Sequence, residues 1–234
     1  MIVSRSAIPH EPAPYRLGTG QIGYDPRYLR AKRLLDLALV ACALAPLSVV
    51  MAIAALAIRL DSPGPAIFRQ RRVGRNGVEF PMLKFRSMYH NCGESSHQAA
   101  YTRFMRGAVL NAADASMPFK LGADPRITRV GRLLRKTSLD ELPQLWNVLR
   151  GHMSLVGPRP PIPYEVALYT PHDRLRLAGP PGLTGPWQVY GRGRVPFHEM
   201  VEQDIAYLRS QSLLYDIKLL LLTIPVVLKG RGGA

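Results

Sequence analysis

Apolar positions along the chain form one long run and several shorter periodic patterns. The long run extends from Leu37 to Ile58, 22 residues without a charge. As a helix it would be about 33 Å long, which matches the roughly 30 Å hydrocarbon thickness of a bilayer, so it predicts a membrane segment. Pro46 lies near its middle, where it removes a backbone donor and crowds the preceding turn. We therefore expect a membrane helix that is broken at Pro46.

Basic residues flank this run on both sides. The flanking cations are Arg30, Lys32, Arg33, Arg59, Arg69, Arg71, Arg72 and Arg75. Because positive charge is retained on the cytoplasmic side of a membrane, two basic flanks predict that both ends of the segment lie on that side. The pattern favours a re-entrant helix over about residues 34–60, with a single-pass span and a buried core helix as the alternatives.

Shorter patterns complete the predicted fold. β-like runs on both sides of Asn76-Gly77 predict a hairpin, because Asn-Gly favours the tight turn between paired strands. Apolar residues recur at helical spacing over 139–149 and 197–208, and a further apolar helix over 213–228 is interrupted by Pro225. We expect an α+β protein, mainly helical, with a re-entrant broken helix, a small β-hairpin and amphipathic helices at the membrane surface.

Two stretches have no apolar period. Residues 1–29 contain four prolines among scattered polar residues, and we interpret them as a mobile N-terminal arm. The first long apolar run starts too late for a secretory signal peptide. Residues 89–121 are interpreted as an insertion or lid within a single membrane-associated domain over 30–234.

The charge balance narrows the class of partner. Thirty-one Lys and Arg residues against 16 Asp and Glu give a net charge of +15, so the ligands should be anionic. No nucleic acid is expected, because helix-turn-helix, zinc-finger and RNP-like patterns are missing and the aromatic residues are not interleaved with basic ones. Lys84 and Arg86 alternate with apolar residues, which predicts two cations on one strand face that suits a diphosphate; a solvated strand face is the alternative.

The strongest chemical signal lies between residues 124 and 161. Ser138 and Glu141 match the S-x-x-E capping box, which places Asp140 and Glu141 in the first turn of a helix. The positive end of the helix dipole favours ionised carboxylates there. One carboxylate can then act as a nucleophile while its neighbour holds a hard cation such as Mg²⁺. The alternative is a purely structural cap that pairs with Arg135.

Cations and a rigid turn accompany this acidic pair in the sequence. The cations just before it are Arg126, Arg129, Arg132, Arg135 and Lys136. They suit phosphoryl transfer, which depends mainly on positioning and charge neutralisation. Arg159 stands between Pro158 and Pro160, a turn that would present one guanidinium to a phosphate. A later Gly-rich loop carries Gln188 and Arg192.

In this order, the motifs resemble those of the monotopic bacterial polyprenyl-phosphate phosphoglycosyl transferases, the bacterial sugar transferase family. The resemblance covers about residues 30–233 and is most specific in DELPQ at 140–144 and SLVGPRP at 154–160. The other matching stretches are KRLLDLALVACALAPLSVV, FRQRRVGRNG, KFRSM and PGLTGPWQVYGR. Ala45 departs from the family pattern, in which serine often precedes the helix-breaking proline.

The resemblance implies a two-step ping-pong reaction at the bacterial inner membrane, with the catalytic domain over 30–234 facing the cytoplasm. Asp140 matches the nucleophile that takes a sugar 1-phosphate from a nucleotide diphosphate sugar, usually a UDP-sugar, and passes it to polyprenyl (undecaprenyl) phosphate. Glu141 matches the Mg²⁺-coordinating residue. With the strand face and the Gly-rich loop, the predicted substrate-binding residues are Lys84, Arg86, Arg135, Pro158, Arg159, Pro160, Gln188 and Arg192.

The family's pathways begin the synthesis of bacterial surface polysaccharides and glycoconjugates. The positive charge also implies anionic membrane lipid as a partner. The sequence leaves open whether the protein forms a homo-oligomer. A non-catalytic membrane scaffold of a polysaccharide assembly complex is the alternative function. The two functions differ in whether the Asp140–Glu141 pair performs chemistry.

Overall fold

The structure is a computed structural model that describes residues 22–23, 25–90, 102, 105, 124–191 and 195–228. Over these residues the chain is mainly helical and has two small two-stranded sheets. The helices are α1 Pro26–Asp61, α3 Arg129–Thr137, α4 Gln144–Leu149, α5 Pro163–Ala167, α6 Phe197–Ser210 and α7 Leu213–Leu228. The strands are β1 Ile67–Val73, β2 Glu79–Phe85, β3 Ser154–Val156 and β4 Gly182–Thr184. The expectation of a mainly helical protein with a small hairpin is confirmed.

Helix α1 begins earlier than predicted. Asp25 caps it, because the Asp25 carboxylate accepts a hydrogen bond from the Arg27 N–H at 2.8 Å, and Pro26 occupies the first helical position, where its missing donor costs little. The last residues of the predicted arm at 1–29 therefore belong to the helix. Residues 1–21 and 24 lie outside the described part of the chain, so the predicted mobility of the arm stays a prediction.

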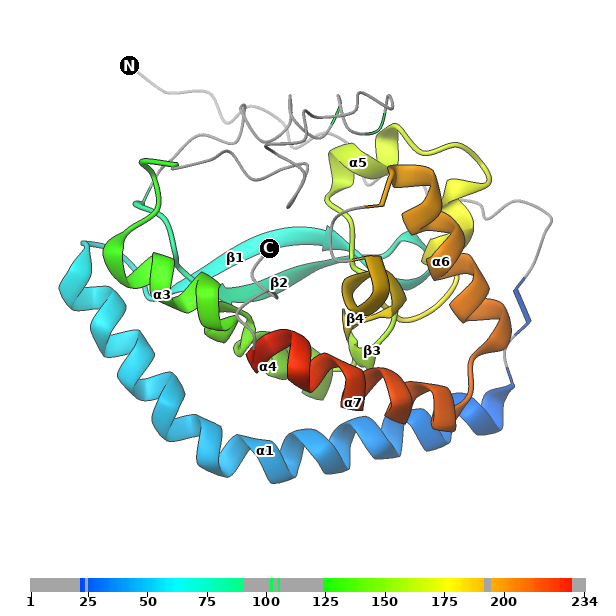
Figure 1. Ribbon diagram of the computed structural model, residues 1–234, viewed down its shortest axis with the longest axis horizontal. Helices are drawn as coiled ribbons and strands as arrows, with labels where there is room; N and C mark the ends of the chain where they lie inside the picture. The colour runs from blue at the N-terminus through cyan, green and yellow to red at the C-terminus, as the bar shows by residue number, and fades with distance from the viewer. Residues whose placement is uncertain are drawn as a thin grey trace, which may run out of the picture.

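Helix α1 continues through Pro46 and bends in its middle, as Figure 1 shows. Pro46 has no N–H for the carbonyl four residues before it, which accounts for the bend. Ser48 Oγ donates to the Ala45 carbonyl at 2.7 Å, so a serine after the proline bonds the backbone at the bend. Of the described helices, α1 alone is long and apolar enough to cross a membrane, and only 11% of its most apolar window is buried. This exposure suits association with a membrane.

The first half of α1 is attached to the rest of the domain by its basic residues. Lys32 Nζ donates to Asp216 Oδ2 of α7 at 2.8 Å, and both side chains are buried. Arg33 donates to the carbonyls of Val148 and Leu149 at the end of α4. Two of the cations that we expected beside the membrane therefore make contacts inside the protein.

The far end of α1 is held by the same domain. Asp61 Oδ2 accepts a hydrogen bond from the Val130 N–H of α3 at 3.0 Å. Ala54 and Ile58 pack with Phe85 of β2 and Leu134 of α3 in one apolar cluster. Both ends of α1 thus meet the same domain, which Figure 1 shows on one side of the bent helix.

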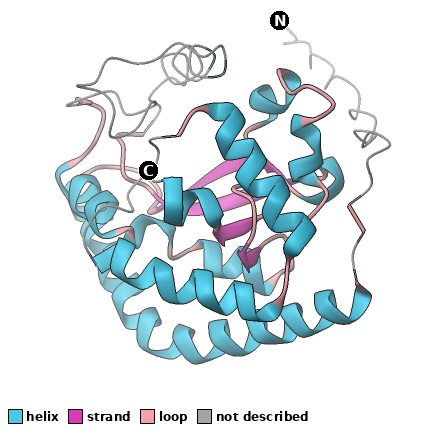
Figure 2. Ribbon diagram, turned by 45° about the vertical axis from the view of Figure 1, so that its right-hand side comes forward, coloured by secondary structure: helices cyan, strands magenta, loops and turns pink. Residues whose placement is uncertain are grey.

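The hairpin forms where Asn76-Gly77 predicts it. Strands β1 and β2 are antiparallel, with Val73 opposite Glu79 and Ile67 opposite Phe85. Asn76 and Gly77 both have positive φ, 57° and 80°, which are conformations that these residue types favour. Figure 2 shows the strands inside a shell of helices.

Helices α6 and α7 close the domain. The predicted apolar stripe of α6 is confirmed as core, since the buried residues include Phe197, Met200, Val201, Ile205 and Leu208. Helix α7 lies beside α1 and runs through Pro225, so that proline does not interrupt the helix. Most of the predicted insertion at 89–121 lies outside the described residues, and its role stays a prediction.

Candidate active site

The acidic pair Asp140–Glu141 lies in a turn between α3 and α4. Ser138 follows the end of α3 with a left-handed backbone, φ 58° and ψ 15°, and its N–H donates to the Arg135 carbonyl at 3.3 Å. Residues Leu139–Glu141 then form a single 3-10 turn. The chain therefore changes direction immediately before the acidic pair.

The predicted capping box is wrong. A capping residue needs an extended backbone to turn its side chain toward the following N–H groups, and Ser138 is left-handed instead. Its Oγ is buried and has no hydrogen-bond partner among the described residues. Helix α4 starts only at Gln144, so Asp140 and Glu141 precede that helix rather than occupying its first turn.

Asp140 is buried, with 6% of its surface exposed, and its Oδ1 has no hydrogen-bond partner in the described structure. Burial raises the pKa of the Asp140 carboxyl to about 6; Lys84 and Arg135 oppose this rise, and Glu141 adds to it. The helix-dipole argument predicted the opposite sign, but the loss of hydrating water outweighs the attraction of the two cations. At neutral pH most molecules still carry an Asp140 carboxylate.

Glu141 forms an ion pair with Lys84 of β2. Lys84 Nζ lies 2.9 Å from Glu141 Oε1, and both side chains are largely buried. Burial opposes the ionisation of both groups and lowers the pKa of Lys84. Attraction to Lys84, and then to Arg159 and Arg72, nevertheless holds the pKa of Glu141 below its ordinary value. A permanent carboxylate therefore stands next to Asp140.

Helix α3 is fixed against Ser87, two residues after the end of β2. The Ser87 carbonyl accepts from the Thr128 N–H at 3.2 Å, and the Ser87 hydroxyl accepts from Arg135 Nε at 2.8 Å. Gly131 comes so near that a Cβ there would stand 2.1 Å from the Ser87 carbonyl oxygen. This close contact brings Arg135 near Asp140, where the opposite charges attract.

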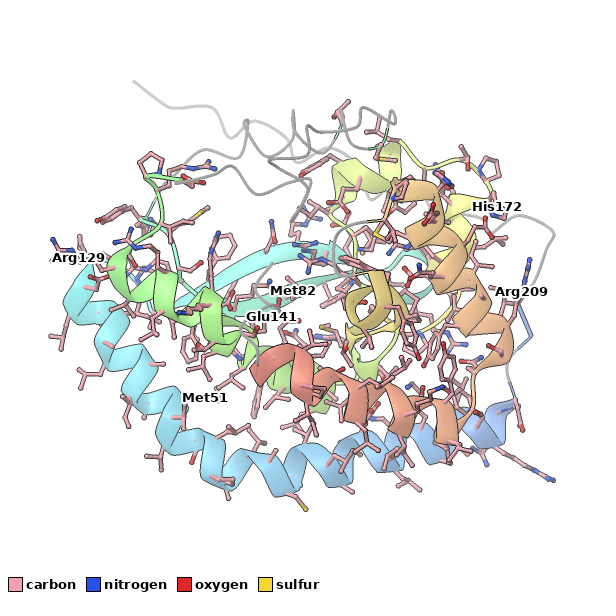
Figure 3. All side chains as sticks on the ribbon, in the orientation of Figure 1. Met51, Met82, Arg129, Glu141, His172 and Arg209 are labelled. Atoms are coloured by element: carbon pink, nitrogen blue, oxygen red, sulfur yellow. The ribbon has the colours of Figure 1, made fainter. Side chains whose placement is uncertain are left out.

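One face of the hairpin lies under the acidic pair. Residues directly opposite in an antiparallel pair share a face, so Gln70 and Arg72 of β1 point to the same side as Met82 and Lys84 of β2. Figure 3 shows Met82 and Glu141 near each other in the middle of the molecule. The hairpin therefore contributes both a cation and an apolar surface to the site.

A small pocket forms between this face, the acidic turn and the loop that carries Arg159. Its lining residues are Arg72, Met82, Lys84, Glu141, Gln144, Arg159, Pro160, Gly182, Leu183 and Gln188. Five predicted site residues meet there, namely Lys84, Glu141, Arg159, Pro160 and Gln188. Residues that are separated by up to about a hundred positions in the sequence thus surround one polar cavity.

The sequence reasoning did not assign Arg72 or Gln144 to the site. A tight two-residue turn at Asn76-Gly77 would pair residue 72 with residue 81, on the face opposite Lys84. The connection over 74–78 instead pairs Arg72 with Phe80, on the face of Lys84. Gln144 ends the DELPQ motif. Its position in the pocket depends on the turn at Ser138, which the sequence does not reveal.

Arg86 does not join Lys84 as predicted. Its guanidinium donates to the Ser62 carbonyl at 2.8 Å and to the Pro63 carbonyl, and so caps the end of α1. Strand β2 ends at Phe85, so strand alternation no longer applies to Arg86. The predicted two-cation face is therefore wrong at this residue.

Asp140, Arg135 and Pro158, which were also predicted, do not line the pocket. Pro158 is buried, and its carbonyl accepts from the Gly182 N–H at 2.9 Å, so it supports the loop that carries Arg159. Arg192 lies outside the described residues, and its predicted substrate contact stays a prediction.

The acidic residues of the site fit a divalent cation that is shared with a substrate. Within the described ranges no group of three or more His, Cys, Asp and Glu side chains is arranged for a metal. Asp140 and Glu141 offer two neighbouring carboxylates, and Asp140 Oδ1 is unpartnered there. Mg²⁺ commonly takes one or two carboxylates and completes its shell with water and substrate phosphates, so this donor set suits it.

The match to the bacterial sugar transferase family covers residues 27–230. Galactosyl transferase CpsE of Streptococcus agalactiae is 43% identical over 211 residues, 90% of this chain and 45% of that protein. Undecaprenyl-phosphate galactose phosphotransferase of Salmonella typhimurium is 47% identical over 171 residues, 73% of this chain and 35% of that protein.

A third relative matches over more of its own length. UDP-glucose:undecaprenyl-phosphate glucose-1-phosphate transferase of Caulobacter vibrioides is 43% identical over 205 residues, 84% of this chain and 69% of that protein. The chain spans less than half the length of the relatives from Streptococcus and Salmonella. The family match nevertheless includes α1, the hairpin, the acidic turn and both closing helices. The chain therefore belongs to the bacterial sugar transferase family.

Proposed function

We propose that this chain transfers a sugar 1-phosphate from a UDP-sugar to polyprenyl phosphate, with Asp140 as the nucleophile. The observation that carries the proposal is a buried, ionisable Asp140 next to Glu141, which together with its ion-pair partner Lys84 and with Arg159 lines the pocket. Names of the relatives support the substrate class, since two of them are described as undecaprenyl-phosphate transferases of galactose or glucose phosphate.

In the proposed first step, a carboxylate oxygen of Asp140 attacks the phosphorus that carries the sugar. A bond forms between that oxygen and phosphorus, and the bond from phosphorus to the bridging oxygen of the diphosphate breaks. The electron pair leaves with the bridging oxygen as uridine monophosphate, and the enzyme keeps an aspartyl phosphosugar. Lys84, Arg135 and Arg159 would offset the charge that collects on the phosphate oxygens.

In the proposed second step, a phosphate oxygen of the polyprenyl phosphate attacks the same phosphorus. The bond from phosphorus to Asp140 breaks and returns the carboxylate, and the product is a polyprenyl diphosphate sugar. Glu141, with Asp140 beside it, is the residue that would hold Mg²⁺. When bound, the ion would neutralise the diphosphate and hold it in line for attack.

We further propose that α1 is re-entrant and that the site faces the cytoplasmic side of the bacterial inner membrane. A spanning helix would place its ends on opposite faces of a hydrocarbon layer roughly 30 Å thick. Lys32 and Arg33 attach one end of α1 to α7 and α4, while Asp61 attaches the other end to α3. Together with the bend at Pro46, these contacts support an entry and an exit on one side.

The decisive experiment is intact-mass measurement of the purified protein with Mg²⁺ and a panel of UDP-sugars, without lipid acceptor. We expect a covalent phosphosugar adduct and release of uridine monophosphate with the correct sugar. Asp140→Asn should form no adduct and should release the nucleotide at least about 10³-fold more slowly, as is usual when a nucleophile is removed.

Asp173→Asn is the matched control, because Asp173 is half-buried, does not line the pocket, and accepts hydrogen bonds from the Thr170 N–H and hydroxyl. This variant should retain the adduct. Release of uridine monophosphate by Asp140→Asn at the wild-type rate would show that the nucleophile is wrongly assigned.

A further inference from the structure

The loop that presents Arg159 is fixed mainly by hydrogen bonds from residues of other segments to its carbonyl groups. Three of the five residues in Gly157–Pro161 are prolines, which have no N–H to donate. The Gly182 N–H donates to the Pro158 carbonyl at 2.9 Å, and the Val73 N–H donates to the Pro161 carbonyl at 2.8 Å. These two backbone bonds fix the loop ends to β4 and β1.

The middle of the loop depends on arginine side chains. Arg72 Nη1 donates to the Pro160 carbonyl at 2.8 Å, whereas the contact that the Arg159 carbonyl receives from Arg176 is long, at 3.5 Å. Arg72 is itself fixed, because its Nε and Nη2 both donate to Gln70 Oε1, at 3.1 Å and 2.8 Å. The shortest bond to the middle of the loop therefore comes from a buried and immobilised guanidinium.

We infer that Arg72 is a positioning residue that acts through Arg159. By holding the Pro160 carbonyl, Arg72 fixes the turn between the two prolines and so aims the Arg159 guanidinium into the pocket. The inference rests on the proposed function, in which Arg159 contacts the nucleotide diphosphate. It deepens that proposal because Arg72 lies in the FRQRRVGRNG stretch but had no role in the reaction assigned to it.

The geometry favours positioning over direct contact with a substrate. Three nitrogens of the Arg72 guanidinium already have protein acceptors on two residues, Gln70 and Pro160. The fork of the guanidinium matches these acceptors in a way that a lysine ammonium cannot reproduce. Arg72 also lies beside Glu141 and Lys84 at the pocket, so a shift of its side chain would reach the acidic pair as well.

The test is a double-mutant cycle between residues 72 and 159, with the affinity for UDP measured by calorimetry on the full chain in detergent. We expect Arg72→Lys to weaken UDP binding about tenfold, because the fork to Gln70 and Pro160 is lost. Combining it with Arg159→Lys should weaken binding no further than Arg159→Lys alone. Such non-additivity is expected when one residue acts through the other.

Two more variants make the cycle specific. Gln70→Met removes the acceptor of Arg72 Nε and Nη2, so it loosens the guanidinium while keeping the arginine, and it should weaken UDP binding about threefold. If Arg72→Lys does not fold, Gln70→Met takes its place in the cycle. Arg71→Gln is the control, since the neighbouring Arg71 is 77% exposed and pairs with Glu79 at the surface; its UDP affinity should stay within about twofold of wild type.

Additive effects in the cycle, or wild-type affinity in both Arg72→Lys and Gln70→Met, would overturn the inference. Wild-type protein that binds UDP but releases no uridine monophosphate from any UDP-sugar would instead refute the proposed function, and the cycle would still report on Arg72. Wild-type protein that binds no UDP would refute both.

Discussion

The protonation of Asp140 links the structure of the turn to the pH response of the proposed reaction. An ordinary aspartate is ionised well below neutral pH, but burial raises the pKa of Asp140 to about 6. In the proposed reaction only the ionised form can attack phosphorus, so lowering the pH through 6 would remove the nucleophile. An aspartate hydrated at a free helix end would stay ionised at this pH.

We therefore predict an acid limb with a midpoint near pH 6 in the profile of kcat/KM for the UDP-sugar. Lys84→Met should move this midpoint to higher pH, because Lys84 is the largest of the groups that lower the pKa of Asp140. The control Lys218→Met removes an exposed lysine of α7 and should leave the midpoint unchanged. An unshifted midpoint in Lys84→Met would argue that another group produces the limb.

Single residues also show how far the sequence could predict the site. Lys84, Glu141 and Arg159 meet at the pocket as their motifs indicate. Arg86 does not, because two residues of spacing place side chains on one face only while the strand lasts, and β2 ends one residue earlier. The left-handed backbone of Ser138 could not be predicted either, because serine rarely adopts this conformation and the local sequence favours the extended backbone of a capping residue.

At the scale of helices and strands, the elements with strong local signals were predicted. Asn76 and Gly77 favour the positive φ angles that the hairpin turn requires, and the apolar stripe of α6 indicates which face of that helix is buried. The contacts that hold α1 were not predicted. From the sequence, Lys32 was expected to lie at the lipid headgroups. It pairs with Asp216 instead, because α7, which is distant in the sequence, packs beside α1.

The buried pair between α1 and α7 gives a prediction about stability. Asp216 also accepts hydrogen bonds from Tyr28 at 2.9 Å and Tyr207 at 2.6 Å, so Lys32→Met leaves the carboxylate with two donors. Asp216→Leu leaves Lys32 with the Tyr207 hydroxyl as its remaining acceptor in that cluster. We expect Asp216→Leu to cost about 3–5 kcal/mol of unfolding free energy and Lys32→Met to cost less.

Thermal and denaturant unfolding in detergent would measure this order. Lys218→Met serves as the control here as well, since an exposed lysine on the same helix should change stability by at most about 0.5 kcal/mol. The reverse order, with Lys32→Met the more destabilising variant, would mean that the hydrogen bonds from Tyr28 and Tyr207 do not compensate the buried Asp216 carboxylate for the loss of Lys32.

The whole molecule presents an apolar side made by two helices. Figures 1 and 2 show α7 beside α1, and both helices expose large apolar side chains. The exposed residues on them include Leu34, Leu39, Val49, Ile53, Leu56, Leu60, Leu214, Ile217, Leu221 and Ile224. A surface of this extent is a binding surface, and lipid matches its chemistry. The domain would therefore rest on the membrane with α7 at the interface.

This arrangement predicts the outcome of cysteine labelling. Arg30 and Pro65 are exposed and lie near the two ends of α1, so cysteines at these positions can report on both ends. Ser62, directly after α1, is buried and would label poorly. In a background that lacks Cys42 and Cys92, Arg30→Cys and Pro65→Cys should react with an impermeant maleimide from the same side of membrane vesicles. Labelling from opposite sides would identify α1 as a spanning helix. Adding Pro46→Leu tests whether the bend itself keeps both ends together.

The contact between α3 and Ser87 also restricts how this protein can be redesigned. A methyl group at Gly131 has no room, because the Ser87 carbonyl oxygen would stand 2.1 Å away. Libraries that vary α3 should leave this glycine unchanged, whereas its exposed neighbours Arg132, Leu133 and Lys136 have room for other side chains. Directed evolution would otherwise discard most clones for a failure of packing, and selectivity would never be sampled.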